Sequence, residues 1–296
     1  MPVLSDFTIE ENVPLSKFTT WKIGGLARYF ANAKTSNLPN IVKFANANNL
    51  KFVILGAGSN VLIPSEGLDC LVIRYFDPKA EFLFGDNSIE VSASLSLPML
   101  VRVAASKGFS DLNFLAGIPG SVGGGIFMNA GIGGENKIEI SQCLDSASIL
   151  DSFGNLKEVS NGYFNFSYRY SSIQCSRDIV LSAKFKLLKK TNPQDAADEI
   201  ISIVKSRRLK EPENRKNCGS VFKACRGVPA GILIDKAGLK GLRVNGAMVS
   251  FKHANWIENL GGASSDDVLN LIAKIKKIVF EKFGEKLEEE VRILSC

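Results

Sequence analysis

Hydrophobic and polar positions follow both helical and strand periods along this chain of 296 residues. An apolar face that includes Ile41 and Val42 predicts a helix over residues 39–49, because Pro39 suits a first helical turn. A second helix is predicted over residues 98–107. Apolar alternation or short apolar runs predict strands, and these cover residues 28–31, 52–55, 70–74, 89–93, 144–150 and 179–187.

Two longer helices are predicted in the C-terminal part of the chain. One covers about residues 194–208, and we expect its apolar stripe to face a core. This stripe consists of Ala197, Ile200, Ile201 and Val204. The other begins at a capping box of Ser264 and Asp267 and ends at Gly284. The last dozen residues are too short to fold alone, and we expect them to pack back on an earlier part of the chain.

Two glycine-rich runs interrupt these elements. Residues 117–125 hold five glycines around one proline, a poor composition for a helix or strand interior. We expect this run to let a pyrophosphate approach the backbone, and a tight turn is the alternative. Residues 56–60 read Gly-Ala-Gly-Ser-Asn and follow an apolar strand. They lack the third glycine and the helix of a dinucleotide fingerprint, so a phosphate-binding nest between two strands is the better interpretation.

Composition and charge narrow the function classes. No stretch of eighteen apolar residues occurs and the N-terminus lacks the pattern of a signal peptide, so we expect a cytoplasmic protein without a membrane partner. Six scattered cysteines and one histidine support neither a disulfide framework nor a metal site. The net charge of +6 is locally dense only at residues 205–216, which favours an anionic small substrate over nucleic acid.

Further motifs, taken in their order along the chain, resemble the UDP-N-acetylenolpyruvoylglucosamine reductase (MurB) family. The resemblance covers nearly the whole chain, and the ordered set is more specific than any one motif. Besides the two glycine-rich runs, it rests on residues 19–25, 127–131, 168–171 (Tyr-Arg-Tyr-Ser), 218–223 (Cys-Gly-Ser-Val-Phe-Lys), 235–241, 252–255 and 287–291 (Leu-Glu-Glu-Glu-Val).

The resemblance implies an α+β fold, with a two-lobed FAD-binding domain of the vanillyl-alcohol oxidase (PCMH) type followed by an α+β substrate-binding domain. Residues 1–65, joined by the tail 285–296, would form the first lobe, residues 66–190 the second lobe, and residues 191–284 the substrate domain. The resemblance also implies FAD and NADPH. Because the single histidine, His253, lies outside both lobes, we expect the FAD to be bound non-covalently.

The activity that the resemblance implies is reduction of UDP-N-acetyl-3-O-(1-carboxyvinyl)-glucosamine to UDP-N-acetylmuramate, for peptidoglycan synthesis. It assigns Ser220 as the proton donor, Glu290 as its electrostatic partner and Arg169 as the cation beside the developing negative charge. On local sequence alone, Gly219-Ser220 could be a turn, and alternation in the tail leaves Glu288 and Glu290 equivalent. The resemblance selects Glu290.

The remaining predicted site residues bind cofactor or substrate. The cofactor set is Gly24, Gly25, Gly56, Gly58, Ser59, Asn60, Gly117, Gly120, Ser121, Gly123, Gly124 and Asn129. The substrate set is Arg215, Lys223, His253 and Asn255. The chain departs from the family where Ala224-Cys225 replaces Asn-Pro, which puts one diphosphate contact in doubt, and also at Ser94 and Ile132. Alternatives are another flavin oxidoreductase of the same fold, such as a carbohydrate oxidase, or a non-catalytic flavin- or nucleotide-binding protein.

Overall fold

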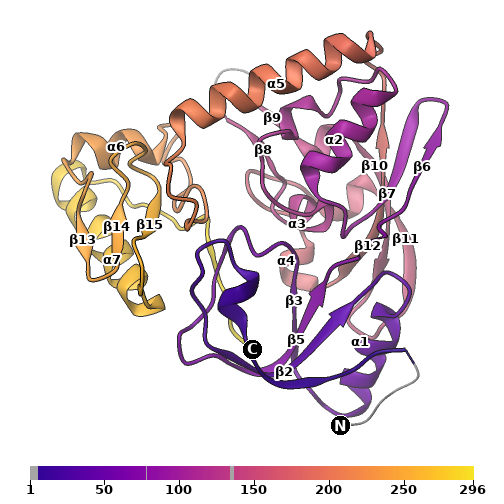
Figure 1. Ribbon diagram of the computed structural model, residues 1–296, viewed down its shortest axis with the longest axis horizontal. Coiled ribbons are helices and arrows are strands. Elements are labelled where there is room, and N and C mark those ends of the chain that lie inside the picture. The colour runs from indigo at the N-terminus through magenta and orange to yellow at the C-terminus, as the bar shows by residue number, and fades with distance from the viewer. Residues whose placement is uncertain (1–5, 78, 134–136) are drawn as a thin grey trace. The chain divides into compact units, whose positions relative to one another are not determined.

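The chain forms two compact units in the computed structural model (Figure 1), which describes residues 6–77, 79–133 and 137–296. Unit 1 comprises the described residues up to Ile9, together with Ala31–Ala57 and Val72–Arg207. Unit 2 comprises Glu10–Phe30, Gly58–Leu71 and Arg208–Cys296. The predicted division into three domains stays a prediction, and its first five residues lie outside the described part.

A sheet of four strands explains why the unit boundaries cut through the N-terminal part of the chain. Two of its strands, β2 and β5, begin in unit 2 and end in unit 1. Its strands, in spatial order, are β1 (Glu10–Pro14), β2 (Leu26–Ala33), β5 (Leu68–Tyr75) and β3 (Phe52–Leu55). Alternating burial along β2 agrees with the predicted strand over residues 28–31.

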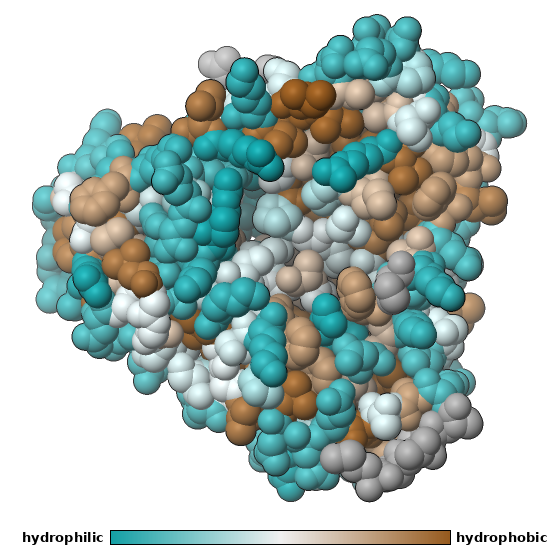
Figure 2. All heavy atoms as spheres, viewed as in Figure 1, coloured by the Kyte–Doolittle hydropathy of each residue, from teal (hydrophilic) through white to brown (hydrophobic). Residues whose placement is uncertain are grey.

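Unit 1 also contains an antiparallel sheet. Its strands, in spatial order, are β11 (Leu156–Ser160), β10 (Leu144–Leu150), β12 (Ile179–Lys186), β7 (Ser88–Ser92) and β6 (Phe82–Gly85). Ala147, Ala183 and Val91 pair across three strands and are buried, so this row belongs to the core. At the β6 edge, Leu83 is 71% exposed, and Figure 2 shows hydrophobic atoms over this strand.

The predicted helices of unit 1 are confirmed, and one further helix corrects an expectation. The elements are α1 (Leu38–Ala47), α2 (Leu97–Ser106), α3 (Val122–Phe127), α4 (Ile173–Ser176), β8 (Gly131–Ile132) and β9 (Ile138–Glu139). Helix α3 contains three consecutive glycines, so the expectation that the whole glycine run avoids helix is wrong. Ser121 caps this helix by accepting a hydrogen bond from the Gly124 N–H at 3.3 Å. Burial of Val122 and Ile126 adds tertiary packing that outweighs the low helix propensity of glycine.

Helix α5 (Pro193–Lys210) does not bury the predicted stripe. Ala196 is its buried residue, whereas Ile201 is 62% exposed. The contacts that hold α5 to unit 1 are partly polar, since the Asn113 amide donates to Glu199 at 2.7 Å and to the Ala196 carbonyl at 3.3 Å. Figure 2 shows hydrophilic side chains over the amino-terminal end of this helix, at the top of the view.

Unit 2 contains a helical layer and short strands around one core. Its remaining elements are β4 (Val61–Leu62), α6 (Ala230–Lys236), β13 (Arg243–Val244), β14 (Ala247–Val249), β15 (Ile257–Asn259), α7 (Ser265–Phe283) and β16 (Arg292–Ile293). The predicted capping box of Ser264 and Asp267 and the left-handed Gly284 cap bound α7 as expected. Trp21 is fully buried in this core, and its indole N–H donates to the Ile257 carbonyl at 2.8 Å.

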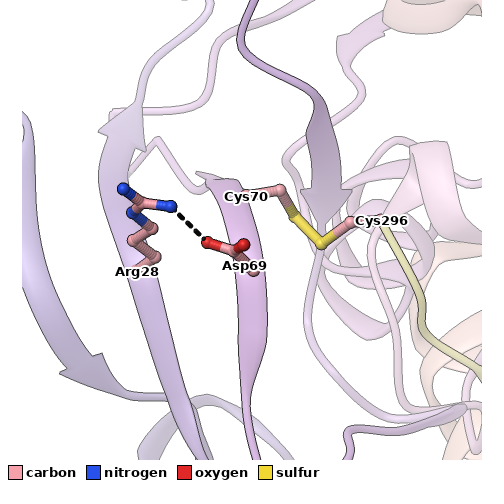
Figure 3. Close-up of a disulfide and its surroundings, with 4 residues drawn as sticks. All are labelled: Arg28, Asp69, Cys70 and Cys296. Atoms are coloured by element: carbon pink, nitrogen blue, oxygen red, sulfur yellow. Dashed lines mark hydrogen bonds and ion pairs between the residues drawn. A yellow bond between two sulfur atoms is a disulfide. The ribbon is translucent and has the colours of Figure 1, made fainter.

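A disulfide joins Cys70 in β5 to Cys296, with their Cα atoms 5.9 Å apart (Figure 3). The expectation of no disulfide is therefore wrong. The two cysteines are 226 residues apart in sequence, so local spacing does not predict the pair. Parallel pairing of β16 with β4 places the C-terminal segment within unit 2 and makes the contact possible. Within the described ranges, no group of three or more metal-binding side chains occurs, and no helix is long and apolar enough to cross a membrane.

Candidate active site

The loop at residues 56–60 contacts another predicted cofactor-binding loop in each unit. In unit 1 it meets the glycine run, because a Cβ on Gly56 would lie 2.8 Å from the Ser121 Oγ atom. In unit 2 the Thr20 N–H donates to the Gly58 carbonyl at 3.0 Å. A Cβ on Gly58 would overlap the Phe18 carbonyl oxygen, and Gly58 has a φ of +65°, so only glycine fits here. Gly25 is equally confined, since a Cβ there would overlap the Ser65 carbonyl oxygen.

The glycine run offers an exposed backbone, but several of its N–H groups are already engaged. Val122 and Gly123 donate to the carbonyls of Leu95 and Ala93, each at 2.8 Å. The glycine run therefore does not provide a row of free N–H groups. Gly124 is exposed, and a Cβ on it would meet Ser121 Oγ at 3.3 Å and no other neighbour within 4 Å. A cofactor can thus approach the backbone at Gly124, beside Gly56 and Ser121, without meeting a side chain. This geometry fits a bulky cofactor such as FAD.

Arg169 lies in a tight turn of unit 1. Ser167 and Tyr170 exchange two backbone hydrogen bonds of 3.1 Å, and Arg169 between them has a φ of 55°. Such a conformation is unfavourable for a residue with a side chain and often marks functional sites. The guanidinium donates to the Gly131 carbonyl at 2.9 Å and lies 5.2 Å from the centroid of the Tyr168 ring. These contacts fix the position of a permanent positive charge.

The side chain of Asn129 stabilises this turn. It is 1% exposed, and its amide donates to the Ser167 carbonyl at 2.9 Å and to Glu139 at 3.1 Å. Its Oδ1 atom accepts from the Ser141 N–H at 3.3 Å. The structure therefore gives Asn129 a positioning role, and its predicted cofactor contact stays a prediction.

Ser220 and Glu290, far apart in sequence, belong to two paired segments of unit 2. The Glu290 N–H donates to the Val221 carbonyl at 2.8 Å, and the Lys223 N–H donates to the Glu288 carbonyl at 2.9 Å. Gly219 precedes the serine with a φ of 78°, which glycine adopts without strain. The pairing places the segment that follows Ser220 beside the segment that carries Glu290, and the roles of these two residues stay predictions.

The pKa of the buried Cys218 thiol is affected by the charge of Glu290. Burial raises the pKa of the Cys218 thiol, and the negative charge of Glu290 raises that pKa further. Cys218 itself stays a neutral thiol.

Three consecutive glutamates have three different environments. Glu288 pairs with Lys223 at 2.5 Å, and Glu289 pairs with Lys276 at 2.8 Å. The backbone carbonyl of Glu290 accepts from the Asn60 amide at 3.2 Å. Glu288 and Glu290 thus differ in their contacts, and the choice of Glu290 as the partner of Ser220 stays a prediction. Sequence alone did not identify the pairs with Lys223 and Lys276, because the partners lie on other segments.

Asn255, predicted to bind substrate, holds the serine segment. It is 6% exposed, and its amide accepts from the Phe222 N–H at 3.0 Å and donates to the Phe222 carbonyl at 2.8 Å. Its own carbonyl accepts from the Val221 N–H at 2.9 Å. The side chain is thus committed to the backbone, and the structure assigns it a positioning role.

The other predicted substrate residues keep accessible polar groups. The Arg215 side chain is 61% exposed and pairs with Glu211 at 2.9 Å. His253 is partly exposed, and its Nδ1 atom accepts from the Asn255 N–H at 3.3 Å. Lys223 is held by Glu288, as described above. Substrate contacts by these three residues stay predictions.

The fold and the exposed glycine backbone define a flavoprotein with an FAD-binding domain of the PCMH type, and residues 27–160 match the family described as "FAD binding domain". The predicted α+β fold class is confirmed. Residues 211–294 match "UDP-N-acetylenolpyruvoylglucosamine reductase, C-terminal domain". The chain belongs to the UDP-N-acetylenolpyruvoylglucosamine reductase family, whose members are oxidoreductases that use FAD and NADPH.

Relatives align with nearly the whole chain. The UDP-N-acetylenolpyruvoylglucosamine reductase of Lactobacillus helveticus is 42% identical over 288 residues, which are 97% of this chain and 95% of that protein. The corresponding reductase of Chlamydia muridarum is 40% identical over 289 residues, with the same coverage. The crystal structure of the reductase from Thermus caldophilus has a TM-score of 0.82 at 33% identity, covering 97% of this chain and 99% of that chain.

Proposed function

We propose that this chain reduces UDP-N-acetyl-3-O-(1-carboxyvinyl)-glucosamine to UDP-N-acetylmuramate, a step of peptidoglycan precursor synthesis. The observation that supports this proposal is the pairing of residues 221–223 with residues 288–290, which holds the segment after Ser220 beside the segment of Glu290 in unit 2. The names of the relatives support the substrate. Bound FAD supplies the hydride chemistry, with NADPH as the donor, and the protein supplies orientation and one proton.

Ser220 is proposed to protonate the substrate carbon next to the one that accepts hydride. A serine hydroxyl is a weak acid, so it needs a strongly basic acceptor and a positioned neighbour. An enolate-like intermediate is such an acceptor, and the Glu290 carboxylate is that neighbour. Arg169 is proposed to stabilise, with its guanidinium group, the negative charge that develops on the substrate carboxylate.

The glycine-rich loops are proposed to hold the FAD. Gly56 and Gly124 leave backbone accessible beside Ser121, and Ser59 and Asn60 add side-chain donors. Binding is proposed to be non-covalent, because the single histidine of the sequence stands at position 253. The UDP-sugar is an anionic small molecule, and the basic residues 205–216 suit its approach. Action in the cytoplasm, without nucleic-acid or membrane partners, belongs to the same proposal.

Stopped-flow absorbance of the flavin tests this function through its two half-reactions. Ser220→Ala should leave reduction by NADPH near the wild-type rate and slow reoxidation by the enolpyruvyl substrate by a factor on the order of 10² to 10⁴. Ser202→Ala, an exposed position on α5, is the matched control. Slowed reduction with unchanged reoxidation would show that Ser220 is not the proton donor. Reoxidation mainly by oxygen would indicate an oxidase, and no turnover would indicate a binding protein.

A further inference from the structure

The disulfide between Cys70 and Cys296 connects a buried sulfur to an exposed residue. Cys70 is 3% exposed in β5, whereas Cys296 is exposed. Its neighbour Asp69 pairs with Arg28 at 2.8 Å, which offsets a carboxylate charge that would otherwise repel an approaching thiolate. A small dithiol can therefore reach the bond from the Cys296 side. Disulfides of this kind are unusual in a cytoplasmic protein, where the glutathione and thioredoxin systems keep thiols reduced.

The same disulfide ends the segment that carries Glu290. Leu287 and Val291 anchor this segment in the unit 2 core, each 3% exposed. Beyond them, the Arg292 N–H donates to the Asn60 carbonyl and the Leu294 N–H donates to the Leu62 carbonyl, each at 3.0 Å. This β16–β4 ladder is two residues long. A covalent bond at residue 296 therefore reinforces a short ladder, six residues beyond Glu290.

We propose that Cys70 and Cys296 form a site of reversible oxidation whose disulfide holds the Glu290 segment in its working position. Reduction consumes one dithiol. A thiolate of the dithiol attacks the Cys296 sulfur, the bond between the two cysteines breaks, and Cys70 leaves as a thiolate that takes up a proton. The second thiol of the reductant then attacks the mixed disulfide and releases Cys296 as a thiol. The protein disulfide gains two electrons and two protons, and the dithiol becomes a disulfide.

Loss of the bond leaves residues 292–296 held by the short β16–β4 ladder, which can then open toward Glu290. Segments held by few contacts open with a free energy near zero, so about half of the reduced molecules would hold the ladder closed. In the molecules whose Glu290 moves with the opened segment, proton delivery slows by about twofold or more. Reduction of FAD by NADPH does not use Glu290 and stays unchanged. The inference goes beyond the proposed function, and its structural part can be tested without activity.

The test compares FAD-loaded protein treated with oxidised or reduced dithiothreitol and then desalted. Alkylation followed by mass spectrometry counts the thiols, hydrogen exchange reports the amides of residues 290–296, and stopped-flow absorbance reports reoxidation by the enolpyruvyl substrate. Cys296→Ser and Cys70→Ser remove the bond from either side. Cys175→Ser, which removes an exposed free thiol, is the matched control.

We expect reduction to free two thiols in wild type and in Cys175→Ser, to speed exchange in residues 290–296, and to slow reoxidation about twofold or more, all reversibly. Cys296→Ser and Cys70→Ser should show the reduced behaviour under both treatments. The proposal is overturned if oxidised wild type already has both thiols free, or if exchange in the segment is the same in both states. Faster exchange with an unchanged reoxidation rate would refute the link to Glu290. Loss of all turnover in every form would instead refute the proposed function and leave the exchange result to decide the disulfide site.

Discussion

Asn255→Ala separates two roles for one residue, since sequence predicts a substrate ligand and the structure shows a clamp on the serine segment. Alanine keeps the backbone contact to Val221 but removes both side-chain bonds to Phe222, of 3.0 and 2.8 Å. Phe222 is 2% exposed, so water does not readily replace the lost partner. The variant therefore leaves the buried N–H and the buried carbonyl of Phe222 without their hydrogen-bond partners.

The cost follows from those two groups. Leaving a buried backbone donor or acceptor unsatisfied costs about 1–3 kcal/mol each, so we expect a loss of about 2–6 kcal/mol in the free energy of unfolding of unit 2. Urea unfolding followed by tryptophan fluorescence measures it, because Trp21 and Trp256 both lie in unit 2. Asn270→Ala, at an exposed position on α7, is the control and should change stability little.

Asn255→Ala should slow only one of the two half-reactions. Because Asn255 holds the segment after Ser220, reoxidation by the enolpyruvyl substrate should slow while reduction by NADPH stays unchanged. A loss of stability under about 1 kcal/mol, accompanied by a raised KM and an unchanged kcat, would refute the positioning role. That result would restore Asn255 to the substrate ligands predicted from the sequence.

Three further predictions follow from the site and its supports. Gly124→Val should keep unit 1 folded, because a Cβ there meets only Ser121 Oγ. The variant should nevertheless lose FAD on gel filtration. Stoichiometric flavin in the variant would contradict the proposed FAD site. Glu290→Gln should slow reoxidation strongly. Glu289→Gln, which weakens the partly exposed pair with Lys276, should leave both half-reactions near wild type and change stability by about 1 kcal/mol or less. A hydrogen bond from the Ser264 N–H lowers the pKa of Asp267, so its stabilisation is present above about pH 4 and is lost as the pH falls through the folded pKa. Asp267→Asn should flatten this acid dependence in urea unfolding; an unchanged dependence would contradict the assignment.

Local signals predicted the elements of this fold well where each signal acts within its own segment. The capping box, the apolar spacing and the terminal glycine of α7 all lie within one helix, and they set its bounds at Ser265–Phe283. The stripe of α5 failed because periodicity shows that a face is apolar but not whether another element covers it. Ile201 is therefore exposed on a helix that was expected to bury it.

Polar residues were harder to predict because their roles depend on the direction of one side chain. Asn129 and Asn255 stand inside family motifs, so a ligand contact was the natural expectation. In the structure both amides point to backbone groups of neighbouring turns, and each supports a residue that carries the proposed chemistry. The Cys70–Cys296 pair depends on a contact between distant segments and has no counterpart in local sequence.

The three glutamates of the tail show why a site can be located from sequence before it can be explained. Their residue type is the same and their positions are consecutive, so composition and charge do not distinguish them. What differs is the partner supplied by another segment: a lysine two residues after Val221 for Glu288, a lysine of α7 for Glu289, and the buried Cys218 beside the serine for Glu290. Both lysine pairs connect the tail to other segments and offset the charges of Glu288 and Glu289. Backbone pairing with residues 221–223 holds the tail beside the serine segment, and Glu290 acts on the pKa of Cys218 in that segment, which is where the proposed proton transfer requires a carboxylate.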